Sequence, residues 1–356
     1  MTNIHGVGFI STGGVYNDFK IVDGKPRVSS MTYLQDIGEG NATGHTAWSK
    51  IGFTPTMNTT DSDVWSAAGL YVFPTAATPM AVIGGANDDG TPALYSGTST
   101  GGSTTSLIDT GKNFTTPTSV VAGDCIVLEA AGTTPEWGYV TSLTSTNQLN
   151  VANGFSSGGT GSGRTYSVIR KALSTGAQAV KIEYLDATYA SKSEIVILNG
   201  AAEVNLVGSP FRINSLRIIA TGTGNAAGSA LSLKAQTPTA TIYSYITAGF
   251  TRARNSVYTV PTGKTLFVVQ FAAAWATTGN ANKEYARIYT RANIEPSTGF
   301  LTGSLFYPFT EISTQNNTVL VHLEIPTKLL AKTDLKISGI ATATGACSTV
   351  LRGWLE

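Results

Sequence analysis

Charged residues are scarce in this sequence of 356 residues. They make up 13% of the chain, about half the share that is usual in soluble proteins. Lysine and arginine number 23, and aspartate and glutamate number 22, so the net charge is +1. No run of basic residues occurs, whereas a protein whose main partner is nucleic acid normally carries a basic stripe. We therefore expect no direct nucleic-acid partner.

Cysteine and histidine are also rare. Cys125 and Cys347 lie far apart with no CxxC spacing, and His5, His45 and His322 are scattered along the chain. These positions match none of the common zinc signatures. We expect two buried free thiols, no metal site and no cofactor.

Long hydrophobic runs are missing as well. The best one, Thr265–Ala276, is far shorter than the roughly 20 residues that a membrane-spanning helix needs. The N-terminal sequence has no charged segment followed by an apolar one, so it predicts no signal peptide. We expect a chain that is made in a cytoplasm, has no membrane partner and stays soluble until it assembles.

What the sequence does contain is a series of short, strand-like runs. In Ala179–Tyr184, for example, apolar residues alternate with Lys181 and Glu183, which is typical of a half-buried strand. Turn signals such as Asn199–Gly200 separate these runs, and no convincing amphipathic helix of ten residues occurs. The sequence predicts an all-β protein: a β-sandwich with an inserted small β-barrel module, followed by a C-terminal jelly-roll domain.

Changes in composition divide the chain into four predicted parts. Residues 1–44, rich in Gly, Asn, Asp and Ser, are expected to form an extended N-terminal arm that orders only on another surface. Residues 90–175 show short β runs with Gly turns, flanked by low-complexity loops, and are predicted to be an inserted small β module. This module would split a β-sandwich made of 45–89 plus 176–238. Residues 239–356 would be a jelly-roll oligomerisation domain.

The strand candidates are clearest at the C-terminal end. In the first half of the sandwich, Val64–Phe73 and Pro79–Ile83 are apolar runs bounded by Pro, Gly and Asn. Beyond residue 239, eight candidates match the size and strand number of a jelly roll: Thr241–Ile246, Asn255–Val260, Thr265–Ala276, Glu284–Ala292, Ser304–Phe309, Thr318–Ile325, Asp334–Thr342 and Ser348–Leu355.

One of these strands predicts self-association. Thr265–Ala276 carries no charge, and both of its faces are apolar or small. One face can fill the interior of a jelly roll, but the other needs a cover, because exposed sheets and edges are normally protected by charge or proline. We expect a homo-oligomer, with a trimer around the jelly rolls as the predicted form.

Several segments resemble a known class of protein. They are GNATGH at 40–45, VWSAAGLYVFP at 64–74, KIEYLD at 181–186, SEIVILNG at 193–200, FRINSLRI at 211–218, VYTVPTGKTLFV at 257–268 and AKTDLKI at 331–337. Over residues 38–89 and 176–356 the chain resembles virion structural proteins of tailed double-stranded-DNA bacteriophages. The inserted stretch is similar to small β modules of phage tail, fibre and capsid-decoration proteins. The resemblance implies a non-catalytic particle component whose partners are the major capsid protein or other virion proteins.

Aromatic residues are the sequence feature with the clearest binding potential. Trp137 follows Pro135–Glu136 in a predicted loop of the inserted module, and Tyr139 and Tyr95 belong to the same module. Exposed aromatic rings stack on sugars or anchor protein interfaces. We therefore name Trp137, Tyr139 and Tyr95 as a possible contact for a host surface glycan or a partner protein.

Candidate catalytic groups are weak by comparison. His322 lies on an alternating strand, on the face opposite Val321 and Leu323, and no G-x-S-x-G nucleophile motif occurs. The aspartate pairs Asp61/Asp63 and Asp88/Asp89 could bind calcium but are better explained as turn and cap residues. We predict no catalytic residues and no enzyme activity.

Three functions remain open from the sequence. The first is a capsid-decorating or cementing protein that grips the shell through its N-terminal arm. The second is a neck, tail or fibre component that touches a host surface glycan. The third is a carbohydrate-binding or hydrolytic β-protein. We expect the first, with the virion, assembled in the bacterial cytoplasm, as its location.

Overall fold

The computed structural model describes residues 18–22, 25–29, 37–40, 42–57, 59–130, 132, 134–152, 154–155, 161–236, 241–277, 286–293, 306–314, 318–341 and 344–356. Within these ranges the protein is all-β with antiparallel sheets, which confirms the predicted class. Helical backbone there is limited to residues 37–38 and a single 3-10 turn, Lys171–Leu173. No helix in the described part of the chain has the length and hydrophobicity to cross a membrane.

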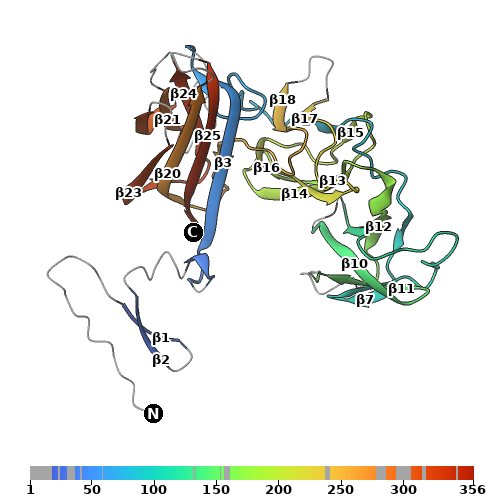
Figure 1. Cartoon of the computed structure of the whole chain (residues 1–356). Coiled ribbons are helices and arrows are strands. Elements are labelled where there is room, and N and C mark those ends of the chain that lie inside the picture. The colour runs from blue at the N-terminus through green and yellow to red at the C-terminus, as the bar shows by residue number, and fades with distance from the viewer. Residues whose placement is uncertain are drawn as a thin grey trace.

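Two sheets, one of five strands and one of four, face each other at the C-terminal end (Figure 1). The first has the order β19 (Val257–Thr259), β24 (Asp334–Ala341), β21 (Ala286–Asn293), β22 (Tyr307–Thr314), with β4 (Ser62–Asp63) also paired to β24. The second has the order β23 (Thr318–Leu329), β20 (Leu266–Thr277), β25 (Gly345–Leu355), β3 (Thr46–Met57). Their inner faces enclose one hydrophobic core that includes Phe271, Trp275 and Leu351.

The pairing of β3 and β4 differs from the sequence prediction. β3 pairs with β25 along its length, and β4 pairs with β24, so these strands join the C-terminal sheets and not those of residues 176–238. The predicted strand Val64–Phe73 is wrong, because Ala68 and Gly69 have φ of 61° and 74° and turn the chain back on itself. Trp65 and Tyr71 consequently meet edge to face, with ring centroids 5.2 Å apart.

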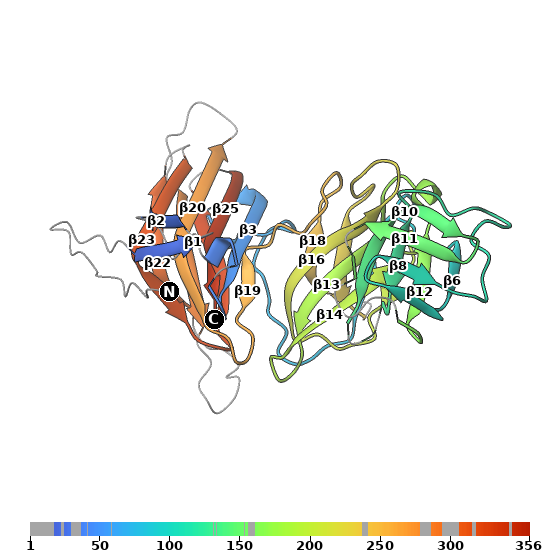
Figure 2. The same ribbon diagram turned by 90° about the horizontal axis from the view of Figure 1, so that it is seen from below.

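A second pair of sheets lies beside the first (Figures 1 and 2). One contains β14 (Ser191–Ile197), β13 (Ala177–Leu185) and β16 (Arg212–Thr221). The other contains β15 (Val204–Asn205), β5 (Met80–Ile83), β17 (Leu231–Ala235) and β18 (Ile242–Ile246). A separate core between them includes Val82, Ile182 and Leu233. β5 pairs as the split-sandwich prediction expects, whereas β18, expected in the jelly roll, belongs here.

The region predicted as an insertion contains one seven-stranded sheet. Its order is β6 (Tyr95–Thr98), β12 (Thr165–Ile169), β9 (Cys125–Leu128), β10 (Glu136–Ser145), β11 (Gln148–Ala152), β8 (Ser106–Ile108), β7 (Gly101–Ser103). One face of this sheet packs around Phe114 and Ile126. The other packs on the sheet of β13, β14 and β16. It is the green region at the far end of the molecule from the C-terminal sheets (Figure 1).

Asp88 holds the two ends of this segment together. Its buried carboxylate accepts hydrogen bonds from the backbone N–H groups of Ala177 (2.7 Å), Gly228 (2.8 Å), Ser229 (2.8 Å) and Gly85 (3.3 Å). The entry and exit of the segment are therefore adjacent, which is the geometry that an insertion at a surface turn requires.

Most of the predicted arm, residues 1–44, lies outside the described residues. Within it the structure describes a hairpin of β1 (Asp18–Val22) and β2 (Lys25–Ser29), together with residues 37–40 and 42–44. The two cysteines are free and buried, as expected, and burial raises the pKa of each thiol to about 12.

Candidate functional site

Trp137 is not the exposed loop residue that its sequence context indicated. It lies on β10, paired with Val127 of β9, and its side chain is half-buried against the cluster of Val127, Ile195 and Ile219. The Lys181 Nζ atom lies 5.5 Å from its ring centroid, and the Arg217 guanidinium carbon lies 5.0 Å away. The ring therefore seals the contact between the inserted sheet and the neighbouring sheet.

Of the other two aromatic candidates, Tyr139 shares a face of the sheet with Trp137, because the two residues pair with Cys125 and Val127 of β9, whereas Tyr95 does not. Tyr139, two residues along β10, is 37% exposed but donates its hydroxyl to the carbonyl oxygen of Ile219 at 2.6 Å. Tyr95 pairs with Val168, whose side chain belongs to the core around Phe114. Residues that pair directly share a face of a sheet, so Tyr95 lies on the face opposite Trp137. The glycan or partner role of these three residues stays a prediction.

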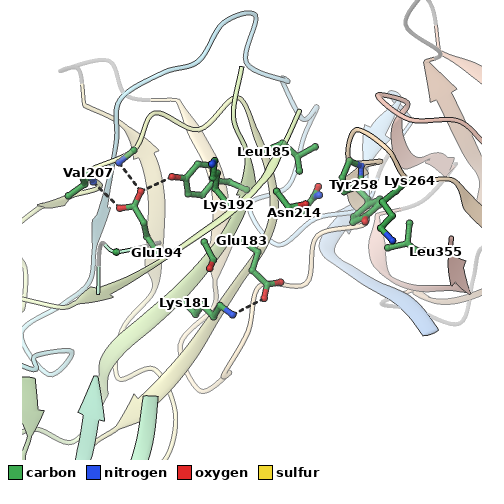
Figure 3. A pocket seen from close by; sticks show the side chains of 16 residues that line it. Lys181, Glu183, Leu185, Lys192, Glu194, Val207, Asn214, Tyr258, Lys264 and Leu355 are labelled. Carbon is green, nitrogen blue, oxygen red and sulfur yellow. Dashed lines mark hydrogen bonds and ion pairs between the residues drawn. The ribbon is translucent and has the colours of Figure 1, made fainter. Parts of the chain in front are cut away.

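A cleft lies between the sheet of β13, β14 and β16 and the C-terminal sheets. Its volume is about 750 Å³. Figure 3 shows Lys181, Glu183 and Asn214 on one wall, facing Tyr258, Lys264 and Leu355 on the other. A size of this order is typical of sites that hold a small ligand or a short segment of chain.

Direct hydrogen bonds hold the two walls of the cleft together. The side-chain amide of Asn214 on β16 donates to the Thr259 carbonyl and accepts from the Thr259 N–H, both at 2.9 Å. Lys50 of β3 donates to the Asn214 carbonyl oxygen. Further along, the Thr262 N–H donates to the Tyr189 carbonyl at 2.9 Å. The cleft is therefore a fixed feature of the described fold.

Glu194 lines this cleft, but both of its carboxylate oxygens accept hydrogen bonds from the protein. Its carboxylate accepts the Tyr184 hydroxyl at 2.7 Å and the N–H groups of Val207 (2.9 Å) and Gly208 (2.7 Å). It pairs with Ile182, so it points toward the sandwich core, and Glu183 next along β13 points the other way. Burial and this carboxylate raise the pKa of Tyr184. The two glutamates do not face each other as a hydrolytic pair requires.

Basic side chains dominate the cleft and the smaller cavity beside it. Together the two are lined by six basic residues, Lys50, Lys181, Lys192, Arg217, Arg252 and Lys264, and by two acidic ones, Glu183 and Glu194. In the whole chain the two signs are nearly equal. Glu183 is shared between Lys181 at 3.4 Å and Arg217 at 3.9 Å. The cleft is therefore suited to a ligand with negative charge.

Burial also affects Lys50, a residue that lines the smaller cavity. Desolvation lowers the pKa of its ammonium group from 10.5 to about 8, and Glu183 opposes part of that shift. A desolvated ammonium group favours the binding of an anion, because the negative charge stabilises the ammonium ion in place of the water that burial has removed.

The aspartates that could have bound calcium have structural roles. Asp63 accepts from Lys336 Nζ at 2.9 Å and from the Tyr71 N–H at 2.6 Å, while Asp88 closes the insertion as described above. Among the described residues no group of three or more His, Cys, Asp or Glu side chains could hold a metal ion. His322 is exposed on β23, on the side away from the core.

No protein-family model matches the chain, and no curated protein matches it either. The sequence did not reveal the cleft or the smaller cavity beside it, because the residues of each come from separate segments. Those of the cleft come mainly from β13, β14, β16, β19 and the loop after β19, and those of the cavity mainly from β3, β13, β16 and residues 252–255. No local pattern links Lys50 to Glu183 or Asn214. Only the packing of separate sheets against one another brings these residues together.

Proposed function

We propose that this chain is a non-enzymatic structural protein of a bacteriophage particle that decorates or cements the capsid and assembles as a trimer. In this proposal the C-terminal sheets are a jelly roll, and the seven-stranded sheet of the insertion curls into a small barrel. The arm of residues 1–44 would grip the shell, and the major capsid protein or another virion protein would be the partner.

The observation that carries the proposal is an apolar row on the outer face of the sheet of β23, β20, β25 and β3. Ala272 pairs with Leu320 on one side and Val350 on the other, and Val350 pairs with Ile51. Phe271 and Ala273 point into the core, so Ala272 and its partners point outward. We call these four residues, Ile51, Val350, Ala272 and Leu320, the outer row.

Edge strands beside the outer row add further apolar surface. Ile325 on β23 is 84% exposed and Tyr307 on β22 is 67% exposed, beside the 52% exposed Leu320 of the outer row, and both strands end their sheets. Ile325 lies within the register shift between Val268 and Gln270, which pair with Thr327 and His322, where the regular alternation of the strand is broken. Exposed apolar edges of this kind favour association with further copies.

The strand orders support the fold part of the proposal. A five-stranded and a four-stranded antiparallel sheet enclose one core, and from β19 to β25 the chain changes sheet at every step except from β21 to β22, which resembles the strand path of a jelly roll. In the insertion, β8, β9, β10, β11 and β12 all contribute to one core around Phe114. A sheet that surrounds its own core is the arrangement from which a small barrel closes.

Light scattering of the purified chain tests the assembly. We expect a species near three times 37.1 kDa at micromolar concentration, because an obligate interface buries on the order of 2,000 Å² or more. A stable monomer would overturn this part of the proposal. A cryo-electron map of the particle tests the position of the protein on it. Copies spread over the shell support decoration, and a single ring at the neck or tail supports the alternative.

A further inference from the structure

A second, smaller cavity of about 350 Å³ lies beside the cleft. It shares Glu183, Asn214, Tyr258 and Leu355 with the cleft and extends between β3, β16 and the segment 252–255. Its lining combines aromatic, amide and cationic side chains.

Two buried polar atoms of residues that line this cavity have no hydrogen-bond partner among the described residues: Oδ1 of Asn255 and Nε of Arg217. Asn255 is only 6% exposed, and its Nδ2 donates to the Ser244 hydroxyl at 2.9 Å. If the amide is turned over, its nitrogen is left without a partner instead. Buried polar atoms are normally satisfied, so these two atoms are available for a ligand with both donors and acceptors.

The charges of the cavity specify the sign of that ligand. Lys50, Arg217 and Arg252 line it against one acid, Glu183, which already lies 3.4 Å from Lys181 and 3.9 Å from Arg217. An anionic group placed near Lys50 would interact with a partly desolvated cation that, among the described residues, donates to the Asn214 carbonyl. The aromatic pair Trp48 and Tyr258, with ring centroids 5.0 Å apart, belongs to the apolar part of the lining, which also includes the aliphatic residues Ile51, Ile213, Leu216, Ala253 and Leu355.

We propose that this cavity binds a sugar that carries a carboxylate, such as a uronic acid unit of an acidic polysaccharide. The aromatic pair would contact the sugar ring, Asn255 and Arg217 would bind its hydroxyl groups, and Lys50 would face the carboxylate. This inference does not rest on the virion assignment. It places saccharide recognition in the cavity and not on Trp137, Tyr139 and Tyr95.

Isothermal titration of the full chain with D-galacturonate and with tri-galacturonate tests the proposal, with galactose as the neutral counterpart. We expect galacturonate to bind at least about 10-fold more tightly than galactose, because the cations contribute only to the acid form. The Lys50→Met variant should weaken galacturonate binding at least 10-fold. Its thermal unfolding reports whether the fold is kept, so a binding loss in a folded variant is assigned to the cavity.

The matched control is Lys112→Met, which removes an exposed lysine of the insertion that lines neither the cleft nor the cavity. This variant should bind galacturonate as the parent does. Equal binding of galactose, equal losses in the two variants, or no binding of either acidic sugar would overturn the proposal. Inorganic phosphate or a hexaglutamate peptide binding as tightly as tri-galacturonate would also overturn it, by assigning a general anion site or an acidic protein partner.

Discussion

Arg212 and Asp334 form a bidentate ion pair across the two halves of the fold, with Nε–Oδ1 at 2.8 Å and Nη2–Oδ2 at 3.0 Å. The two side chains are 1% and 3% exposed. Asp334 also accepts the Thr259 hydroxyl, and the Arg212 guanidinium lies 4.0 Å from the Phe211 ring centroid. The pair fixes β16 against β24 and so sets the spacing of the cleft walls.

Removing one member of this pair should destabilise the protein strongly. Asp334→Ala leaves the Arg212 charge buried without its carboxylate, and we expect a loss of about 3–5 kcal/mol in the free energy of unfolding. Urea unfolding followed by tryptophan fluorescence measures it. The control is Glu203→Ala, which breaks the more exposed ion pair with Lys234 and should cost less than about 1 kcal/mol. A loss below 1 kcal/mol for Asp334→Ala would show that the pair does not hold the halves together.

Lys50 gives the protein a pH-dependent stability. Its pKa is 10.5 in the unfolded chain and about 8 in the folded one, so the folded state disfavours the charged form. This destabilisation is complete below pH 8. It disappears as the pH rises from 8 to 10.5, because in that range the folded protein has released the proton while the unfolded chain still binds it. Lys50→Met should therefore stabilise the protein at pH 7 by up to about 3 kcal/mol.

The measurement is the urea midpoint of the parent and the Lys50→Met variant from pH 6.5 to 10.5. The gain should shrink steadily between pH 8 and 10.5. A gain that stays constant with pH would mean that packing of the methionine, and not removal of the buried charge, produces it. Lys112→Met should show no such trend, because that lysine is exposed.

The sequence predicted the C-terminal strands well because local signals mark them. The turn at Pro261–Gly263 precedes β20, where Gly263 has φ of 70°, and apolar alternation runs through β23 up to Leu323. β3 was missed for a physical reason: its core-side positions include Lys50 and Gly52 and not a run of apolar residues. The Cβ of a side chain at Gly52 would lie 2.6 Å from Ser256 Cβ, so the close packing at this position requires glycine. Glycine interrupts the apolar alternation by which a strand is recognised in the sequence.

The candidate site was less accessible from sequence than the fold. Trp137 looked exposed because Pro135 and Glu136 precede it, but strand pairing and the cluster around Ile195 bury half of it. The cleft depends on Lys50 and Asn214, which are 164 positions apart. Such contacts follow from how whole sheets pack, and no periodicity along one segment encodes them.

The inserted segment should be removable without loss of the remaining fold. The Gly176 N–H donates to the Asn87 carbonyl at 2.8 Å, so a two-glycine link can replace residues 91–175. We expect a cooperative unfolding transition by circular dichroism, at a stability lowered by about 2–4 kcal/mol because Ile195 and Ile219 lose their cover. A chain with no cooperative transition would show that the predicted domain division is wrong.

Asp88 provides the companion test of that junction. Asp88→Ala in the full chain removes the acceptor for four backbone N–H groups and should cost at least about 2 kcal/mol in the free energy of unfolding. The same substitution should cost a similar amount in the deletion variant, since Gly85, Ala177, Gly228 and Ser229 remain. A cost in the full chain alone would assign Asp88 to the insertion and not to the surrounding sandwich.

A charge placed in the outer row should separate the subunits of the proposed trimer without unfolding them. Leu320 is 52% exposed in the single chain, so Leu320→Asp should change the stability of the isolated subunit by no more than about 0.5 kcal/mol. In the assembly the carboxylate would be buried unpaired, which we expect to raise the dissociation constant by about 30-fold or more. Sedimentation velocity over a concentration series measures the shift.

The matched control is Val121→Asp, because Val121 is 49% exposed but lies in the insertion. If Val121→Asp dissociates the assembly and Leu320→Asp does not, then the subunits meet through the inserted module, and the exposed apolar face of the C-terminal sheet has another partner.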